Sequence, residues 1–160
     1  MGNLIADAIV AAVGAGIAII NGGGMWADRT DDAETRLLRR DIPVELPCIG
    51  ATVTTEPAGS QVLAALANRR SRVARGSGRF AQVSGLRLAD DPGAGAGSRM
   101  AQGMVGGQAI DPGRVNRGAN NDFLLGGGAG YTAPGGGRVI IDGGNGTLMA
   151  NDVMAASGRW

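Results

Sequence analysis

The architecture of this 160-residue chain depends on residues 4–20, which read Leu-Ile-Ala-Asp-Ala-Ile-Val-Ala-Ala-Val-Gly-Ala-Gly-Ile-Ala-Ile-Ile. Asp7 is their only charged residue. Asn3 is suited to cap a helix, Asp7 favours the first helical turn, and Gly22 would end the helix. We expect residues 4–20 to be helical and buried by other chains, because a helix that is apolar on all sides has no face for solvent.

Other interpretations of this apolar stretch are weaker. A signal peptide would begin with basic residues, and N-myristoylation would need Ser or Thr at position 6, where this chain has Ala. Val13–Gly16 resembles the glycine turn of dinucleotide-binding folds, but Ile19 occupies the place of the third glycine. Two alternatives stay open, a membrane-inserting helix and a helix or strand buried against partner subunits.

The composition leaves little material for a conventional core. The chain contains 30 Gly, and aromatic residues make up only 3% of it. Leu, Ile, Val and Phe together number 34 by our count of the sequence, about a fifth of the chain. That fraction lies near the level at which chains become disordered, so we expect little independent core.

The basic and nucleophilic residues exclude many reactions. All 15 basic residues are Arg, and the chain has no Lys and no His. It therefore lacks the Lys of a P-loop, the Lys of Schiff-base chemistry and the His of a catalytic triad. Cys48 is the single thiol and cannot form an internal disulfide. We predict that the protein is not an enzyme and that it uses no cofactor and no metal.

The middle of the chain alternates between helical and extended patterns. Asp31–Arg40 has the charge order of a short helix, with acids first and Arg last. Ile42–Leu46 and Ile49–Thr55 are β-branched stretches between prolines and should be extended. Ser60 should cap the best helix of the chain, and Arg79–Ala89 should form a strand.

A cluster of Arg residues follows this helix without any acid among them. Direct contact with nucleic acid is one interpretation, but the cluster lacks interleaved aromatic residues and any known binding motif. We favour ion pairs with other chains, because the planar guanidinium of Arg binds carboxylates through two hydrogen bonds. The cluster consists of Arg69, Arg70, Arg72, Arg75 and Arg79.

The C-terminal half is glycine-rich. Glycine at this density disfavours long helices, because each interior Gly costs about 1 kcal/mol relative to Ala. Residues 138–150 are the clearest local signal and predict a β-hairpin closed by the loop at residues 143–146. The same stretch is similar to glycine-rich calcium repeats, but it lacks their Asp at Thr147 and their multiple copies, so we exclude calcium binding.

These patterns predict a mixed α+β fold with two or three short helices, short strands and much irregular, glycine-rich extended chain. We expect an apolar N-terminal anchor over residues 1–24, a small mixed segment over 25–89 and a glycine-rich extended segment over 90–160. Such a chain, unable to fold alone, would be ordered by its neighbours.

We therefore hypothesise a structural accessory component of a large assembly. The most natural assembly is a virion, in which the chain would be a bacteriophage capsid decoration, cement or tail-associated protein that stabilises neighbouring subunits. The alternative is a small membrane-associated protein inserted through residues 4–20, for example during genome delivery. Its partners would be other subunits, including copies of itself, with nucleic acid or membrane as secondary candidates. The expected interface residues are Ile5, Ile9, Val13, Ile17, Ile20 and the five Arg of the cluster.

Overall fold

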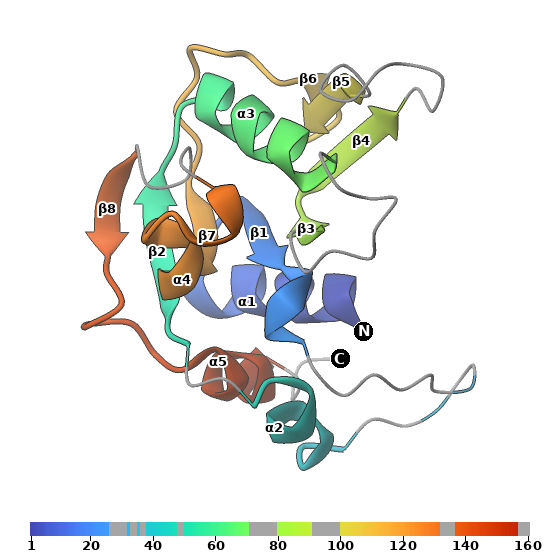
Figure 1. The fold of residues 1–160 in the computed structure, drawn as a ribbon, viewed down its shortest axis with the longest axis vertical. Helices are drawn as coiled ribbons and strands as arrows, with labels where there is room; N and C mark the ends of the chain where they lie inside the picture. Colours follow the sequence, from blue (N-terminus) through green and yellow to red (C-terminus); the bar gives the residue numbers. More distant parts are fainter. Residues whose placement is uncertain are drawn as a thin grey trace.

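A computed structural model describes residues 1–25, 32, 35, 38–47, 50–70, 80–90, 100–131 and 137–156, with only the backbone of 69, 70, 90 and 100–102. Within these residues the fold is mixed α+β, as expected, with more helices than the two or three predicted (Figure 1). The helices are α1 (Gly2–Val13), α2 (Asp41–Glu45), α3 (Gly59–Arg70), α4 (Asp122–Leu125) and α5 (Met149–Ala156), with 3-10 turns η1 (Gly22–Gly24) and η3 (Gly128–Gly130).

The main sheet has five strands in the order β3-β1-β7-β2-β8. Its strands are β1 (Ile17–Asn21), β2 (Thr52–Glu56), β3 (Ala81–Ser84), β7 (Gly118–Asn121) and β8 (Arg138–Ile141). The central strands β1 and β7 run parallel, and every other neighbouring pair in the sheet is antiparallel. The sheet therefore joins strands that lie far apart in the sequence.

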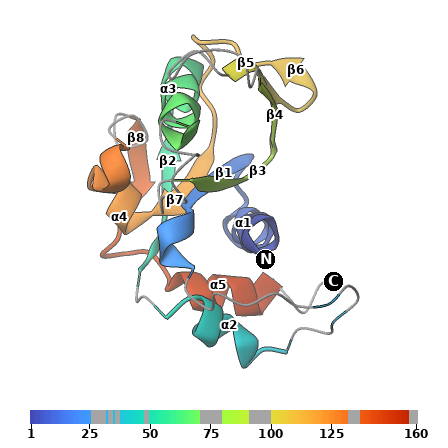
Figure 2. The same ribbon diagram turned by 45° about the vertical axis from the view of Figure 1, so that its right-hand side comes forward.

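Strand β1 is buried on both faces, and its side chains alternate between two cores. Ala18 and Ile20 point into a cluster with α1, α2 and α5, which we call the α1 core. Ile17 and Ile19 point into a second cluster with α3, which we call the α3 core. Figure 2 shows α3 above the strands and α2 and α5 below them, with α1 beside the sheet. The chain therefore builds its core from its own residues.

The apolar stretch is divided between a helix and a strand. Helix α1 ends at Gly14, which has a left-handed backbone with φ of 62°, and the amides of Gly14 and Ala15 both donate to the carbonyl of Val10. The expectation of one helix over residues 4–20 is therefore wrong in its second half. The reason is that glycine adopts this left-handed conformation without strain, while the β-branched side chains after it favour a strand.

Three expectations for the middle of the chain are corrected or refined. The predicted helix Asp31–Arg40 falls largely outside the described residues. Against the expectation that Ile42–Leu46 is extended, Asp41–Glu45 forms helix α2, which tolerates Pro43 because its missing N–H falls in the first turn. The predicted strand Arg79–Ala89 is broken at Gly85, which has φ of 69° and separates β3 from β4.

A second sheet covers the far side of α3. It is a three-stranded antiparallel meander of β4 (Leu86–Asp90), β5 (Met100–Val105) and β6 (Gln108–Ala109). Leu63, Leu86 and Leu88 pack against the α3 core. Helix α3 is thereby held between the two sheets, which makes it a rigid support for the segments that contact its ends.

The expected hairpin at residues 138–150 is correct only in its first strand. Arg138–Ile141 is strand β8, but its partner is β2, and the residues after the turn form helix α5. Met149 and Val153 of this helix are buried in the α1 core. Burial against α1 decides the outcome, because a helix places Met149, Val153 and Ala156 on one buried face, whereas a strand would turn Ala156 away from the other two.

We predict that the α1 core stabilises the isolated chain. Replacing Ile9, which is fully buried, with Ala removes apolar contacts and leaves a cavity. We expect the free energy of unfolding to fall by about 2–5 kcal/mol, measured by urea denaturation of the purified chain followed by circular dichroism. Val44→Ala is the matched control, because Val44 is 58% exposed and should change stability by less than about 0.5 kcal/mol. Equal stability of the two variants would contradict this account of the core.

Candidate functional site

The parallel strands β1 and β7 each end in an asparagine, and the two side chains meet. Asn121 Nδ2 donates to Asn21 Oδ1 at 2.8 Å in a buried hydrogen bond. Asn121 Oδ1 in turn accepts from the amide of Leu124 at 2.9 Å and so caps helix α4. Because the carboxyl ends of neighbouring parallel strands lie together, the segments that follow both strands leave the sheet at one place.

The segment after β1 is the glycine turn η1. The amide of Gly22 donates to the carbonyl of Phe80 at 2.9 Å, and a Cβ on Gly22 would lie 2.8 Å from that carbonyl oxygen. Around Gly24, in contrast, a Cβ would meet no heavy atom of the described residues within 4 Å. One end of the turn is therefore locked to the neighbouring strand, while the other end leaves open space beside the backbone.

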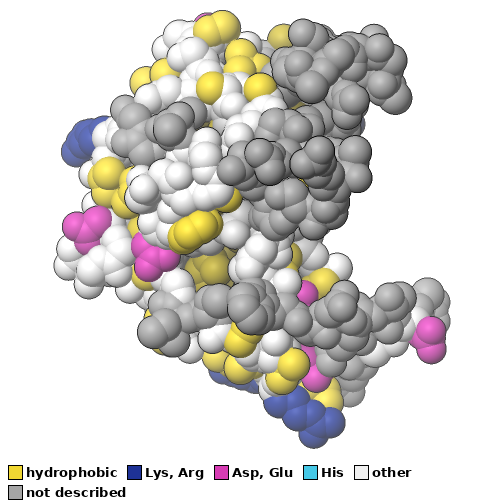
Figure 3. Space-filling view, viewed as in Figure 1, with side chains coloured by type: hydrophobic (Ala, Val, Ile, Leu, Met, Phe, Trp, Pro, Cys, Tyr) yellow, Lys and Arg dark blue, Asp and Glu magenta, His cyan; other side chains and the backbone are white. Residues whose placement is uncertain are grey.

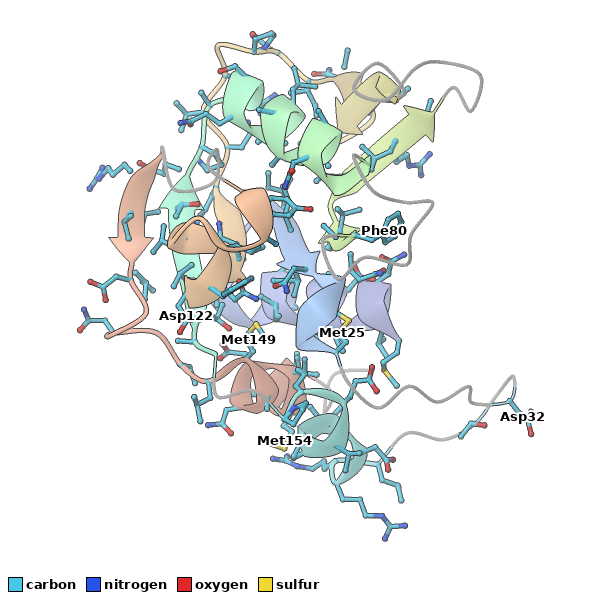
Figure 4. The ribbon with its side chains drawn as sticks, in the orientation of Figure 1. Met25, Asp32, Phe80, Asp122, Met149 and Met154 are labelled. Atoms are coloured by element: carbon cyan, nitrogen blue, oxygen red, sulfur yellow. The ribbon has the colours of Figure 1, made fainter. Side chains whose placement is uncertain are left out.

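The segment after β7 is helix α4, which begins with Asp122. Its carboxylate accepts from its own helix at the amide of Phe123, at 2.8 Å, and from the amide of Ala51, at 3.2 Å. Figure 4 shows Asp122 close to Met149, and both side chains lie near the backbone of Gly50. Asp122 therefore ties the start of α4 to the segment that precedes β2, and its oxygens are engaged by backbone amides.

Phe123 is the large apolar side chain that this arrangement leaves open to solvent. It is 55% exposed, although it is one of only two Phe in the chain. Its backbone and ring lie directly against Gly128, where a Cβ would come within 2.5 Å of Phe123 Cε1 and of its carbonyl oxygen. Glycine at position 128 is thus required by this close approach, and the turn that contains it supports the ring.

That supporting turn, residues 126–131, has an unusual backbone. Gly127 and Gly130 have positive φ values, and Ala129 also has φ of 55°. Such a conformation costs a residue with a Cβ about 1–2 kcal/mol, so contacts around Ala129 must hold it. Asn68 Nδ2, in the last turns of α3, donates to the carbonyl of Ala129 at 3.3 Å, and Tyr131 is buried in the α3 core.

Arg side chains lie away from this region on the visible face, whereas the carboxylate of Asp122 belongs to it. In the space-filling view the described Arg side chains lie at the left edge and at the lower end of the molecule (Figure 3). Among the described residues, no group of three or more His, Cys, Asp or Glu could hold a metal ion. No helix in the described part of the chain has the length and hydropathy needed to cross a membrane.

The residues predicted for an interface are not brought together at this site. Ile5, Ile9, Ile17 and Ile20 are buried inside the chain, and Val13 packs against the α1 core. Arg69 and Arg70 are described only by their backbone, at the end of α3, and Arg72, Arg75 and Arg79 lie outside the described residues. Contacts of these residues with other chains stay a prediction.

The sequence carries only a faint signal of this site. The signal is an asparagine that comes shortly before a run of three glycines, and it occurs twice. Asn21 precedes Gly22–Gly24, and Asn121 precedes Gly126–Gly128 by a single short helix. Taken alone, the first run indicates only the end of a helix, and the second is only part of the glycine-rich C-terminal half. The two glycine runs belong to one site only because β1 and β7 pair in parallel, which places the ends of both strands together.

Residues 1–136 match the family model described as 5'-nucleotidase, C-terminal domain. The chain is similar to the crystal structure of a 5'-nucleotidase precursor from Thermus thermophilus, with 31% identity and a TM-score of 0.83 over 97% of the chain. It shares the fold of the NAD nucleotidase of Haemophilus influenzae, with 19% identity and a TM-score of 0.73 over 96% of the chain. A putative 5'-nucleotidase from Staphylococcus aureus has the same fold, with 14% identity and a TM-score of 0.80 over 99%.

The chain spans about a third of the length of these proteins, namely 31%, 28% and 33% of each in that order. No curated protein sequence matches it. The family match overturns the expectation of a bacteriophage capsid or tail component located in a virion, and it contradicts the expectation that the protein is not an enzyme. The virion hypothesis depends on the glycine-rich composition and the small supply of large apolar side chains, yet the chain forms two cores from its own residues. The absence of Lys and His is informative only about reactions that those residues perform, since a domain can belong to an enzyme without carrying its acid–base groups.

We predict that Asn121 holds the site together. Asn121→Ala removes the cap of α4 and leaves Asn21 Oδ1 without its donor in a buried position. The free energy of unfolding should fall by about 2 kcal/mol, since a lost cap and an orphaned acceptor each cost about 1 kcal/mol or more. Asn116→Ala is the control, because its side chain makes one exposed hydrogen bond. A loss no larger than that of the control, measured by urea denaturation, would mean that the Asn pair is dispensable.

Proposed function

The chain belongs to the 5'-nucleotidase C-terminal domain family, and from this premise we propose that it is the nucleotide-recognition domain of a nucleotidase-type hydrolase. The substrate class is a nucleoside phosphate, as the names of the similar proteins indicate. The reaction is hydrolysis of the bond to phosphate. The groups that activate water and the phosphate would lie outside residues 1–160, since the matched proteins are about three times longer than the matched region.

The observation that carries this proposal is the exposed ring of Phe123. A solvent-exposed aromatic ring costs free energy unless a ligand covers it, and nucleobases stack on such rings. The ring is supported from behind by Gly128, so its free face is directed away from the turn. It also stands beside the carboxyl ends of β1 and β7, the place at which sheets with parallel strands commonly bind ligands.

The two segments that follow β1 and β7 suit the uncharged part of a nucleotide. Within the described residues, open space beside Gly24 leaves the backbone of the η1 turn accessible to a planar or ribose group. Asn21 and Asn121 stand at the base of the two segments and hold them at a fixed separation. We propose that the domain binds the nucleoside moiety and thereby places the phosphate for reaction elsewhere.

This division of labour has a physical advantage. Binding energy from the base and ribose can hold the reacting phosphate in one orientation. This lowers the entropic part of the barrier, because the reacting groups no longer have to find one another in solution. A rigid support is needed for such positioning, and the site is built on a sheet whose inner strands β1 and β7 are both buried. The domain would therefore contribute to catalysis by orientation rather than by proton transfer.

We expect Phe123→Ala to weaken nucleotide binding. The affinity of the chain for adenosine 5'-monophosphate, measured by isothermal titration calorimetry, should fall by about 5-fold to 150-fold, the equivalent of a base–aromatic stack of about 1–3 kcal/mol. Phe123→Tyr retains the ring and should bind within about 2-fold of the original protein.

The control for this experiment is Val115→Ala, which removes an apolar side chain that is 60% exposed and lies outside the site. It should leave the affinity unchanged. Unchanged affinity of Phe123→Ala, with the same unfolding midpoint as the parent chain, would refute the assignment of Phe123 to the base.

A further inference from the structure

We infer that Asn68 is a positioning residue of this site and that it acts through the turn at residues 126–131 on the orientation of Phe123. The inference rests on the proposed function. Asn68 lies on α3, is 61 residues away in sequence from Ala129 of the turn and belongs to a different part of the fold. Its assignment depends on two contacts that connect the helix to the ring and on a third that fixes the helix to the sheet.

The first contact joins Asn68 to the turn. Asn68 Nδ2 donates to the carbonyl oxygen of Ala129 at 3.3 Å, and this bond is partly buried. The second contact joins the turn to the ring, since Gly128 lies against Phe123 so closely that a Cβ there would overlap Phe123 Cε1. Gly128 and Ala129 are consecutive in the chain, so a displacement of the backbone at Ala129 also moves Gly128. The position of the ring is thereby linked to α3.

The third contact fixes α3 itself. Val62, Ala65 and Leu66 of this helix are buried in the α3 core against the sheet. The last turn of α3 is therefore held to the same sheet whose strand ends form the site. The hydrogen bond from Asn68 restrains the glycine-rich turn relative to this helix. The turn has few side chains of its own that could pack.

The turn needs such an external anchor because of its backbone. Gly127, Ala129 and Gly130 all have positive φ values, and Ala129 is the single residue other than Gly with this conformation in the described part of the chain. Glycine-rich segments have many accessible conformations, so an unanchored turn would sample several of them. A hydrogen bond to the carbonyl of the strained residue selects the conformation that supports the ring.

The test is a double-mutant cycle between Asn68 and Phe123. Asn68→Asp keeps the size of the side chain and removes the donor, because a carboxylate can only accept. We expect the dissociation constant for adenosine 5'-monophosphate to rise about 2-fold to 12-fold, the range for loss of one neutral hydrogen bond. In the Phe123→Ala background the same substitution should change the dissociation constant by less than about 2-fold.

The matched control is Asn151→Asp, which makes the same chemical change at an exposed position of α5. It should leave the affinity unchanged. Amide hydrogen exchange at residues 127–131 gives a second readout, and we expect faster exchange there in Asn68→Asp but not in Asn151→Asp.

The outcomes separate the inference from the proposed function. If Phe123→Ala binds the nucleotide as well as the parent chain, the proposed function fails. If Phe123→Ala binds weakly while Asn68→Asp binds normally, the proposed function stands and the positioning role of Asn68 is wrong. An equal loss of affinity from Asn68→Asp with and without the Phe123 ring also overturns the inference, because it shows an effect on the fold that does not pass through the ring.

Discussion

Burial of strand β1 on both faces is the constraint on which the rest of the structure depends. Five consecutive residues are removed from water, and their apolar side chains divide between two clusters. Each cluster contains mainly Ile, Val, Leu and Ala, so its apolar area comes from many small side chains rather than from a few aromatic rings. A strand of this kind must also satisfy its backbone groups, which it does by pairing with β3 on one side and β7 on the other.

The same constraint places the candidate site. Since β1 and β7 run parallel, their carboxyl ends meet, and the polar residues that end each strand can bond to one another. The segments that follow are built from glycine turns and a single short helix, so their shape is set by contacts with the sheet and with α3. Phe123 is exposed because it lies on the outer side of that short helix, while its neighbour Leu124 is buried in the α3 core.

The proposed role in nucleoside binding is compatible with a chain that has no Lys and no His and belongs to a family named for a hydrolase. Such a role would need an exposed ring, a close backbone and rigid support, and glycine supplies the close backbone at little steric cost. Proton transfer and phosphate activation need other residues. Composition is informative about which reactions a domain can perform itself, and it is uninformative about which enzyme the domain serves.

The sequence by itself determined the fold class, the helix that begins near Ser60 and the strand at residues 138–141. These features follow from local patterns of apolar, capping and β-branched residues, which act over a few turns of the chain. The sequence did not determine how residues 4–20 are buried, since α1 keeps an exposed face at Asp7, Ala11 and Ala12. The tertiary structure alone decided that Met149–Ala156 is a helix, because its apolar face is buried by α1. It also decided that two asparagines, 100 residues apart, share a hydrogen bond, since strand pairing over such separations depends on global packing and leaves no mark in the local sequence.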